Sequence, residues 1–207
     1  MRLFLGVELD ERVRAAAADA VEELRARLRR SRTEVLARWV APENLHVTLW
    51  FIGEANDDRA AEIRGTLQRV LSTPAFELRA RGCGAFPAAG PPRVFWLGIT
   101  GGAEPMLRLY GEVKDRLVGI GFEPEKRPYS PHITIARVKA VRSRVFTSAG
   151  SSQDRDLTPR AARAVREALA GMTADCGACR IDAVTLFRSH LSPNGSRYEP
   201  LLRVPLS

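Results

Sequence analysis

Cysteine and lysine are both scarce in this chain of 207 residues. The three cysteines, Cys83, Cys176 and Cys179, are a small and uneven number, which does not form a disulfide framework. Cys176 and Cys179 have the spacing of half a zinc site, but no second pair accompanies them, so we expect ordinary thiols and no metal or cofactor. The chain also lacks the glycine-rich loops that hold phosphates in Walker-type and dinucleotide-binding folds.

Long hydrophobic segments are absent too, and no apolar run approaches the ~18 residues that a membrane span requires. Residues 1–8 are too short and turn acidic too soon for a signal-peptide core, so they predict a first strand. A hydrophobic content of 45% is ordinary for a chain that buries a core. These features predict one domain over residues 1–207, in a cytoplasmic, monomeric protein without membrane contact.

Positive charge is what the chain has in excess. The formal net charge is +8 and the pI is about 10.2. Of the 32 basic residues 29 are arginines, whose planar side chains grip phosphate in a bidentate manner. This balance favours a polyanionic partner such as RNA. A GC-rich coding sequence produces the same arginine excess, so the charge alone leaves both interpretations open.

Hydrophobic periodicity predicts a mixture of helices and strands without a regular βαβ order, which favours an α+β fold with antiparallel pairing. Helices are predicted at 11–30, 57–71, 104–118 and 159–170. Strands are predicted at 3–7, 46–52, 76–80, 93–99, 131–138, 181–187 and 197–204, with loops at 82–92 and 143–159. Each half contains a strand, a helix and a strand bearing a His-x-Thr motif, so we expect pseudo-twofold symmetry.

The two His-x-Thr motifs are His46/Thr48 and His132/Thr134, each inside a short apolar run. On a strand, residues two apart share a face, so each His and its Thr point the same way. Strict alternation turns the intervening apolar side chains into the core; these are Val47, Leu49, Phe51, Ile133 and Ile135.

Two such pairs facing each other supply the groups that in-line displacement at phosphorus requires. A histidine can give or take a proton near neutral pH. A threonine hydroxyl can donate a hydrogen bond to a nonbridging phosphate oxygen. A strained cyclic phosphate needs no metal for this reaction. The pattern therefore predicts His46 and His132 as catalytic residues, with Thr48 and Thr134 as phosphate ligands.

Four further residues are candidates for contact with the substrate. Strict alternation places Arg137 on the other face of the strand from His132, so contact of Arg137 with the phosphate requires a β-bulge or a strand end. Trp50 shares the parity of His46, and Tyr198 and Arg93 are further candidates for contact with a base. His190 has no Thr partner and is predicted to lie at the surface.

These residues resemble the two-histidine phosphoesterase superfamily, and specifically its LigT-like RNA 2',3'-cyclic phosphodiesterases. The similarity extends over nearly the whole chain and is weakest at 141–177, which looks expanded. The matching segments are 1–4, 44–49, 51–54, 84–87, 92–96, 131–137 and 186–189.

The resemblance implies a bilobal α+β fold in which two mostly antiparallel concave sheets, flanked by helices, enclose a central cleft. It also implies hydrolysis of 2',3'-cyclic phosphates on RNA ends or nucleotides to 2'-phosphomonoesters. His46 would protonate the leaving 3' oxygen and His132 would activate water. Thr48, Thr134 and Arg137 would hold the phosphate.

Two alternatives stay open. One is a module that binds or ligates RNA ends without efficient turnover. The other is a phosphodiesterase for a different substrate, such as 2'-5' oligoadenylate or ADP-ribose 1'',2''-cyclic phosphate.

Overall fold

The computed structural model describes residues 1–31, 33–143, 159–192 and 195–207. Within these ranges the chain forms four α-helices, one short 3-10 helix and nine strands. The helices are α1 (Glu11–Arg30), η1 (Pro42–Asn44), α2 (Asp57–Leu67), α3 (Ala103–Val118) and α4 (Pro159–Ala170). The strands are β1 (Arg2–Glu8), β2 (Thr33–Trp39), β3 (His46–Glu54), β4 (Phe76–Phe86), β5 (Val94–Gly101), β6 (His132–Ser143), β7 (Asp175–Ile181), β8 (Ala183–Ser192) and β9 (Gly195–Pro205).

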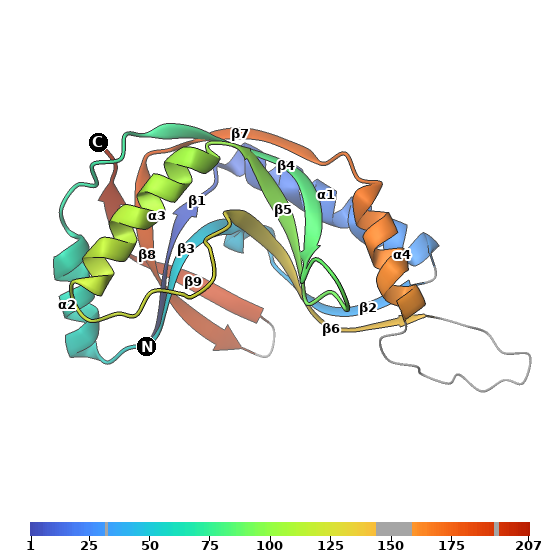
Figure 1. Cartoon of the computed structure of the whole chain (residues 1–207), viewed down its shortest axis with the longest axis horizontal. Coiled ribbons are helices and arrows are strands. Elements are labelled where there is room, and N and C mark those ends of the chain that lie inside the picture. The colour runs from blue at the N-terminus through green and yellow to red at the C-terminus, as the bar shows by residue number, and fades with distance from the viewer. Residues whose placement is uncertain (32, 144–158, 193–194) are drawn as a thin grey trace, which may run out of the picture.

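The strands form an antiparallel sheet in the order β7-β4-β5-β6-β3-β1-β8-β9, with β2 paired to β6. Figure 1 shows this sheet curved into an arch. The predicted α+β class with antiparallel pairing is confirmed. The two predicted concave sheets meet along β3 and β6, where the recorded pairing is the single residue pair Val47–Ile133. The two halves of the arch are therefore joined by little strand pairing at their junction.

The helices pack at the two ends of the arch and leave the middle of its concave side uncovered (Figure 1). Asp10 caps α1 by accepting a hydrogen bond from the Val13 N–H at 2.7 Å, and α1 then contacts α4 and β7. At the other end α3 contacts α2 and β3. Both long helices bury one apolar stripe, as amphipathic helices do. In the described residues, no helix has the length and apolar character needed to cross a membrane.

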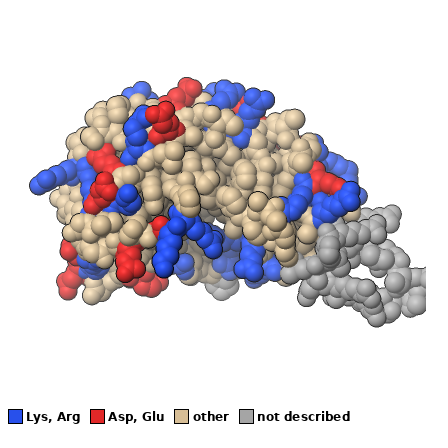
Figure 2. Space-filling model, viewed as in Figure 1, with Lys and Arg blue, Asp and Glu red and all other residues tan. Residues whose placement is uncertain are grey.

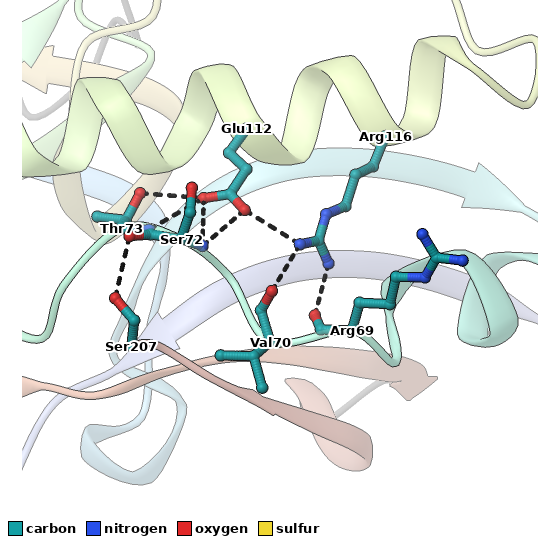
Figure 3. Close-up of polar contacts among 7 residues, drawn as sticks. All are labelled: Arg69, Val70, Ser72, Thr73, Glu112, Arg116 and Ser207. Carbon is teal, nitrogen blue, oxygen red and sulfur yellow. Dashed lines mark hydrogen bonds and ion pairs between the residues drawn. The ribbon is translucent and has the colours of Figure 1, made fainter.

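A polar network joins α3 to the segment after α2 and to the C-terminal residues (Figure 3). Glu112 accepts hydrogen bonds from the Ser72 N–H at 2.8 Å and from the Thr73 N–H and hydroxyl at 3.2 Å. Burial alone would raise the pKa of Glu112, but these hydrogen bonds outweigh burial and lower it. Arg116 pairs with the same carboxylate at 3.0 Å, and the Ser207 N–H donates to the Thr73 carbonyl at 3.2 Å.

Some element boundaries differ from the predictions. Strands β2 and β7 are not predicted from the sequence, because each carries a weak apolar alternation and β7 contains Gly177 at positive φ. The loop predicted at 82–92 is wrong in its first part, since pairing with β5 carries β4 to Phe86. The helix predicted to reach residue 71 ends at Leu67. The loop predicted at 143–159 falls almost wholly on residues 144–158, which lie outside the described residues.

Candidate active site

The two His-x-Thr motifs meet on the concave side of the sheet, at the junction of the two halves. Val47 pairs with Ile133 in antiparallel register. The same register places His46 across from Thr134 and Thr48 across from His132. Directly opposed side chains in such a pair lie on one face with Cβ atoms ~5 Å apart. The four predicted residues therefore form a diagonal arrangement, in which each histidine has both threonines as neighbours.

Backbone carbonyls hold both imidazole rings in the same way. His46 Nδ1 lies 2.7 Å from the Asn44 carbonyl, and His132 Nδ1 lies 2.8 Å from the Ser130 carbonyl. Because a carbonyl oxygen only accepts, Nδ1 carries the proton in each neutral ring. Each Nε2 is then left with its lone pair, ready to accept a proton. His46 Nε2 accepts from the Thr48 hydroxyl at 2.9 Å.

Both motif strands contain a β-bulge directly after the threonine. In β3 the partners of Leu5 and Gly6 are Trp50 and Thr48, so Leu49 is extra. In β6 the partners of Phe95 and Trp96 are Ala136 and Thr134, so Ile135 is extra. An extra residue reverses the alternation beyond it. The burial patterns of residues 46–51 and 132–137 are accordingly identical, with an exposed residue at the fifth position after each histidine.

The bulges change which side chains reach the cleft. Arg137 lines the cleft beside Thr134, which fulfils the condition that its sequence position requires. The prediction that Phe51 points into the core is wrong, because its side chain is 52% exposed and lines the cleft. The prediction that Trp50 faces the cleft is also wrong, because only 5% of it is exposed and its ring stacks on Tyr110.

Aromatic contacts tie the loop that precedes His132 to the strand of the first motif. Trp50, Tyr110 and Tyr129 form a continuous stack, with ring centroids 5.9 and 4.3 Å apart. The Tyr129 hydroxyl donates to the Thr48 carbonyl at 2.9 Å. Burial raises the pKa of Tyr129 well above its usual value, so the hydroxyl stays a donor. Sequence reasoning missed this link, since Tyr129 belongs to no motif.

Burial and positive charge lower the pKa of both histidines. Burial is the largest cause for His46 and, together with the charges of Arg137 and His132, brings its pKa to about 4. Burial also lowers the pKa of His132, with Arg137 adding to the effect. The hydrogen bonds from Asn44 and Ser130 oppose these shifts without cancelling them. Both rings are therefore uncharged at neutral pH in the empty protein.

A cleft of about 630 Å³ extends from Thr134 and Arg137 past His46 toward β1, β2, β8 and β9. Figure 2 shows basic side chains gathered beside the hollow on this side of the molecule. Tyr198 lines the cleft, as one interpretation of the sequence predicts. Arg93 and His132 are not among its described lining residues, so the cleft extends mainly on the His46 side. Four arginines line it: Arg2, Arg38, Arg137 and Arg197.

The surroundings of the two histidines differ in chemistry. The His46 ring lies 4.8 Å from the ring of Phe4 and 5.3 Å from that of Tyr198. The His132 ring makes an edge contact with Phe86 at 5.1 Å. His190 pairs with Glu199 at 2.7 Å in the β8–β9 hairpin and takes no part in either motif.

The cysteines lie elsewhere, in β4 and β7. Cys176 and Cys179 are buried, and Cys83 is partly buried with its thiol donating to the Leu169 carbonyl at 3.2 Å. Burial raises the pKa of Cys83 and Cys176 to about 11, so these thiols stay protonated at neutral pH. In the described part of the chain, no three His, Cys, Asp or Glu side chains gather as metal ligands.

Comparisons with known proteins agree with this geometry. The model of the LigT-like phosphoesterase family matches the chain in two segments, residues 13–96 and 97–198, each of which contains one His-x-Thr motif. A Methanothermobacter thermautotrophicus protein is 33% identical over 199 residues, covering 96% of this chain and 95% of the relative. An Aeropyrum pernix protein is 44% identical over 120 residues, covering 57% and 68%. Both relatives are named RNA 2',3'-cyclic phosphodiesterase.

Solved structures share the whole fold. A crystal structure of a Thermus thermophilus protein matches with a TM-score of 0.69 and 28% identity, over 99% of this chain and 97% of the other. The crystal structure of E. coli LigT complexed with 3'-AMP matches with a TM-score of 0.66 and 23% identity, over 100% and 98%. The latter similarity concerns the fold alone.

Proposed function

Because the chain belongs to the LigT-like phosphoesterase family, we propose that it hydrolyses 2',3'-cyclic phosphates on RNA ends or nucleotides to 2'-phosphomonoesters without a metal. The names of the relatives support this substrate. The observation that carries the proposal is the Val47–Ile133 register, which brings two histidines and two threonines together on one concave face. This set contains an acid, a base and two donors to phosphate oxygens.

In the proposed reaction, water attacks phosphorus in line with the bond to the 3' oxygen. Nε2 of His132 takes a proton from the water as the new P–O bond forms. Nε2 of His46 gives a proton to the 3' oxygen as the old P–O bond breaks. Thr48, Thr134 and Arg137 hold the nonbridging oxygens, where negative charge accumulates in the transition state. The product keeps its phosphate on the 2' oxygen.

The shape of the cleft supports this division between the histidines. The leaving 3' oxygen is part of the ribose, so the nucleoside must lie on the side of the acid. The cleft extends past His46, whereas His132 is absent from its described lining residues. In-line attack then brings water from the opposite side, which is that of His132.

The lowered pKa values fit a site that is charged by its substrate. An uncharged His132 is already in the form a base requires. His46 must gain a proton, and the negative phosphate opposes the effect of Arg137 and stabilises the imidazolium. Acid function at His46 therefore develops when the substrate is bound.

Phe51 supplies a flat apolar surface within the same cleft. The residue is 52% exposed, and its ring lies 6.3 Å from the ring of Phe4. An unpaired nucleobase stacks favourably on such a ring. We assign Phe51 to the base of the terminal nucleotide, on the nucleoside side of the cleft.

We place the protein in the cytoplasm as a monomer. The three cysteines are free, which is typical of proteins in reducing compartments. Sedimentation of the purified protein at assay concentration tests the monomeric state.

The decisive assay uses an RNA oligonucleotide ending in a 2',3'-cyclic phosphate, in excess EDTA, with the product phosphate position identified by NMR. We expect a 2'-phosphate from the wild type. His46→Ala and His132→Ala should each lose at least 10²-fold in kcat, since a well-placed acid or base contributes ~10²–10⁴-fold. His190→Ala is the matched control and should retain activity.

Other results would redirect the proposal. Full activity in either motif variant would refute the paired-histidine mechanism. Loss of activity in EDTA would indicate a metal enzyme. RNA binding without turnover would favour an RNA-end binding or ligation module. Faster cleavage of 2'-5' oligoadenylate would identify a different phosphodiester as the substrate.

A further inference from the structure

The cleft is larger than one nucleoside 2',3'-cyclic phosphate requires, and several of its lining residues are basic. It measures about 630 Å³ and runs from Thr134 to the β8–β9 hairpin and to β2. Among its described lining residues, Glu43 is the only carboxylate, against four arginines. The proposed reaction assigns a role to Arg137 and leaves Arg38, on β2, without one.

Arg38 lies directly opposite Arg137 in the β2–β6 ladder. Like charges directly opposite each other across two strands are destabilising. In the part of the chain that the structure describes, neither guanidinium group makes an ion pair or a side-chain hydrogen bond. Two other exposed arginines of the sheet have carboxylate partners, Arg79 with Asp175 at 2.7 Å and Arg203 with Asp182 at 2.6 Å. An anion from outside the chain is the missing partner of the opposed pair.

The positions of the two arginines indicate two anions rather than one. Arg137 follows Thr134 by three residues; Thr134 faces the cleft before the bulge, and the bulge at Ile135 turns Arg137 toward the same cleft. Arg38 lies one strand farther out, ~4.8 Å away in the hydrogen-bonding direction. β2 and β3 pair with the same strand, β6, at successive positions, so Arg38 continues the line that leads outward from the motifs.

We propose that Arg38 binds the phosphate on the 5' side of the terminal nucleotide, while Arg137 binds the reactive phosphate. This proposal rests on the proposed function. The cleft then selects an RNA end over a free nucleoside 2',3'-cyclic phosphate. The shared chemistry is a phosphate on the 5' oxygen, either as a diester within a chain or as a terminal monoester. Arg38 is thus a specificity residue and takes no part in proton transfer.

The test compares kcat/KM for three substrates that share a terminal adenosine. These are adenosine 2',3'-cyclic phosphate, its 5'-phosphorylated form, and the dinucleotide ApA with a 2',3'-cyclic end. We expect the wild type to prefer the dinucleotide at least tenfold over the mononucleotide. Arg38→Gln should remove that preference and leave the mononucleotide rate within about twofold. Arg180→Gln, an exposed change of equal charge on β7, should keep the preference.

Salt dependence supplies a second measurement. One phosphate contact on a single strand contributes ~0.7 to the slope of log affinity against log salt. The slope for the dinucleotide should fall by about this amount in Arg38→Gln and stay unchanged in Arg180→Gln. The 5'-phosphorylated mononucleotide distinguishes the two sources: equal preference for it and the dinucleotide means that a monoester suffices.

Two results would overturn this role for Arg38. One is an equal loss on mononucleotide and dinucleotide, which would place Arg38 at the reactive phosphate. The other is a wild type without preference. If the wild type hydrolyses none of the substrates, the proposed function fails, and the Arg38 site is then judged by binding alone. In that case ApA 2'-phosphate should bind more tightly than adenosine 2'-phosphate, and Arg38→Gln should abolish the difference.

Discussion

The two halves of the cleft have the same backbone arrangement around their motifs. They differ in the side chain that each half presents beyond its motif. Each half places a histidine, an apolar residue and a threonine before a β-bulge, and each anchors Nδ1 on the carbonyl two residues earlier. The burial patterns then coincide for six residues. At the fifth position after the histidine, however, one half presents Phe51 and the other Arg137. The duplicated scaffold thus supplies matched proton-transfer groups, and one position per half separates an aromatic end from a cationic end.

The cationic end should give the largest effect when it is removed. Arg137→Gln deletes a charged donor to the phosphate, and hydrogen bonds to charged groups contribute ~1.5–3 kcal/mol, or roughly 10–100-fold. We expect kcat/KM on a cyclic-phosphate RNA to fall by about that factor, measured by steady-state kinetics. Arg180→Gln should change it less than twofold. A change of similar size in Arg180→Gln would mean that general attraction of RNA, rather than local contact, accounts for the effect.

The aromatic end should give a smaller effect, confined to binding. In Phe51→Ala we expect KM to rise about fivefold with kcat little changed, since a base on an exposed ring contributes at least ~1 kcal/mol. Phe51→Tyr keeps the ring and should keep KM. Because half of the Phe51 side chain is exposed, thermal unfolding should show little loss of stability. A fall in kcat at constant KM would contradict stacking on Phe51.

This contrast also shows what sequence patterns can and cannot predict. Period-two alternation suffices up to each threonine, so the paired His-x-Thr face is predictable. Beyond it, the bulges at Leu49 and Ile135 reverse the alternation. The run Leu49-Trp50-Phe51 is apolar throughout, so no residue there signals the reversal. In the second motif a signal exists, because strict alternation would bury the charge of Arg137 beneath the sheet.

Links between distant segments are the part that local patterns miss. The Tyr129 hydroxyl reaches the Thr48 carbonyl across 81 residues of chain, and Arg38 meets Arg137 only because β2 pairs with β6. In strand β2 the apolar residues do not alternate regularly with polar ones, so its sequence alone does not predict a strand. Tertiary pairing therefore decides both features. The pseudo-twofold arrangement was predictable because the motif itself is repeated.

The smallest expected effect is a shift in the pH dependence of activity, and it tests the difference between the two ends most directly. The reaction needs His46 protonated and His132 neutral, while the pKa of His46 is about 4 and that of His132 lies below 6.5. A plot of kcat/KM against pH, which reports the free protein, should therefore be bell-shaped with its maximum on the acid side of 6.5. Arg137 lowers both pKa values by its charge, so Arg137→Gln should move both limbs to higher pH.

NMR titration of the histidine ring protons in the empty protein checks the same shifts without turnover. Removing the cation makes protonation easier, so the resonances of His46 and His132 should titrate at higher pH in Arg137→Gln than in the wild type. Phe51→Ala removes the side chain at the equivalent position but no charge, and both titrations should move much less. If the two variants shift the pKa values of the histidines equally, a change in burial rather than the loss of the Arg137 charge accounts for the shift.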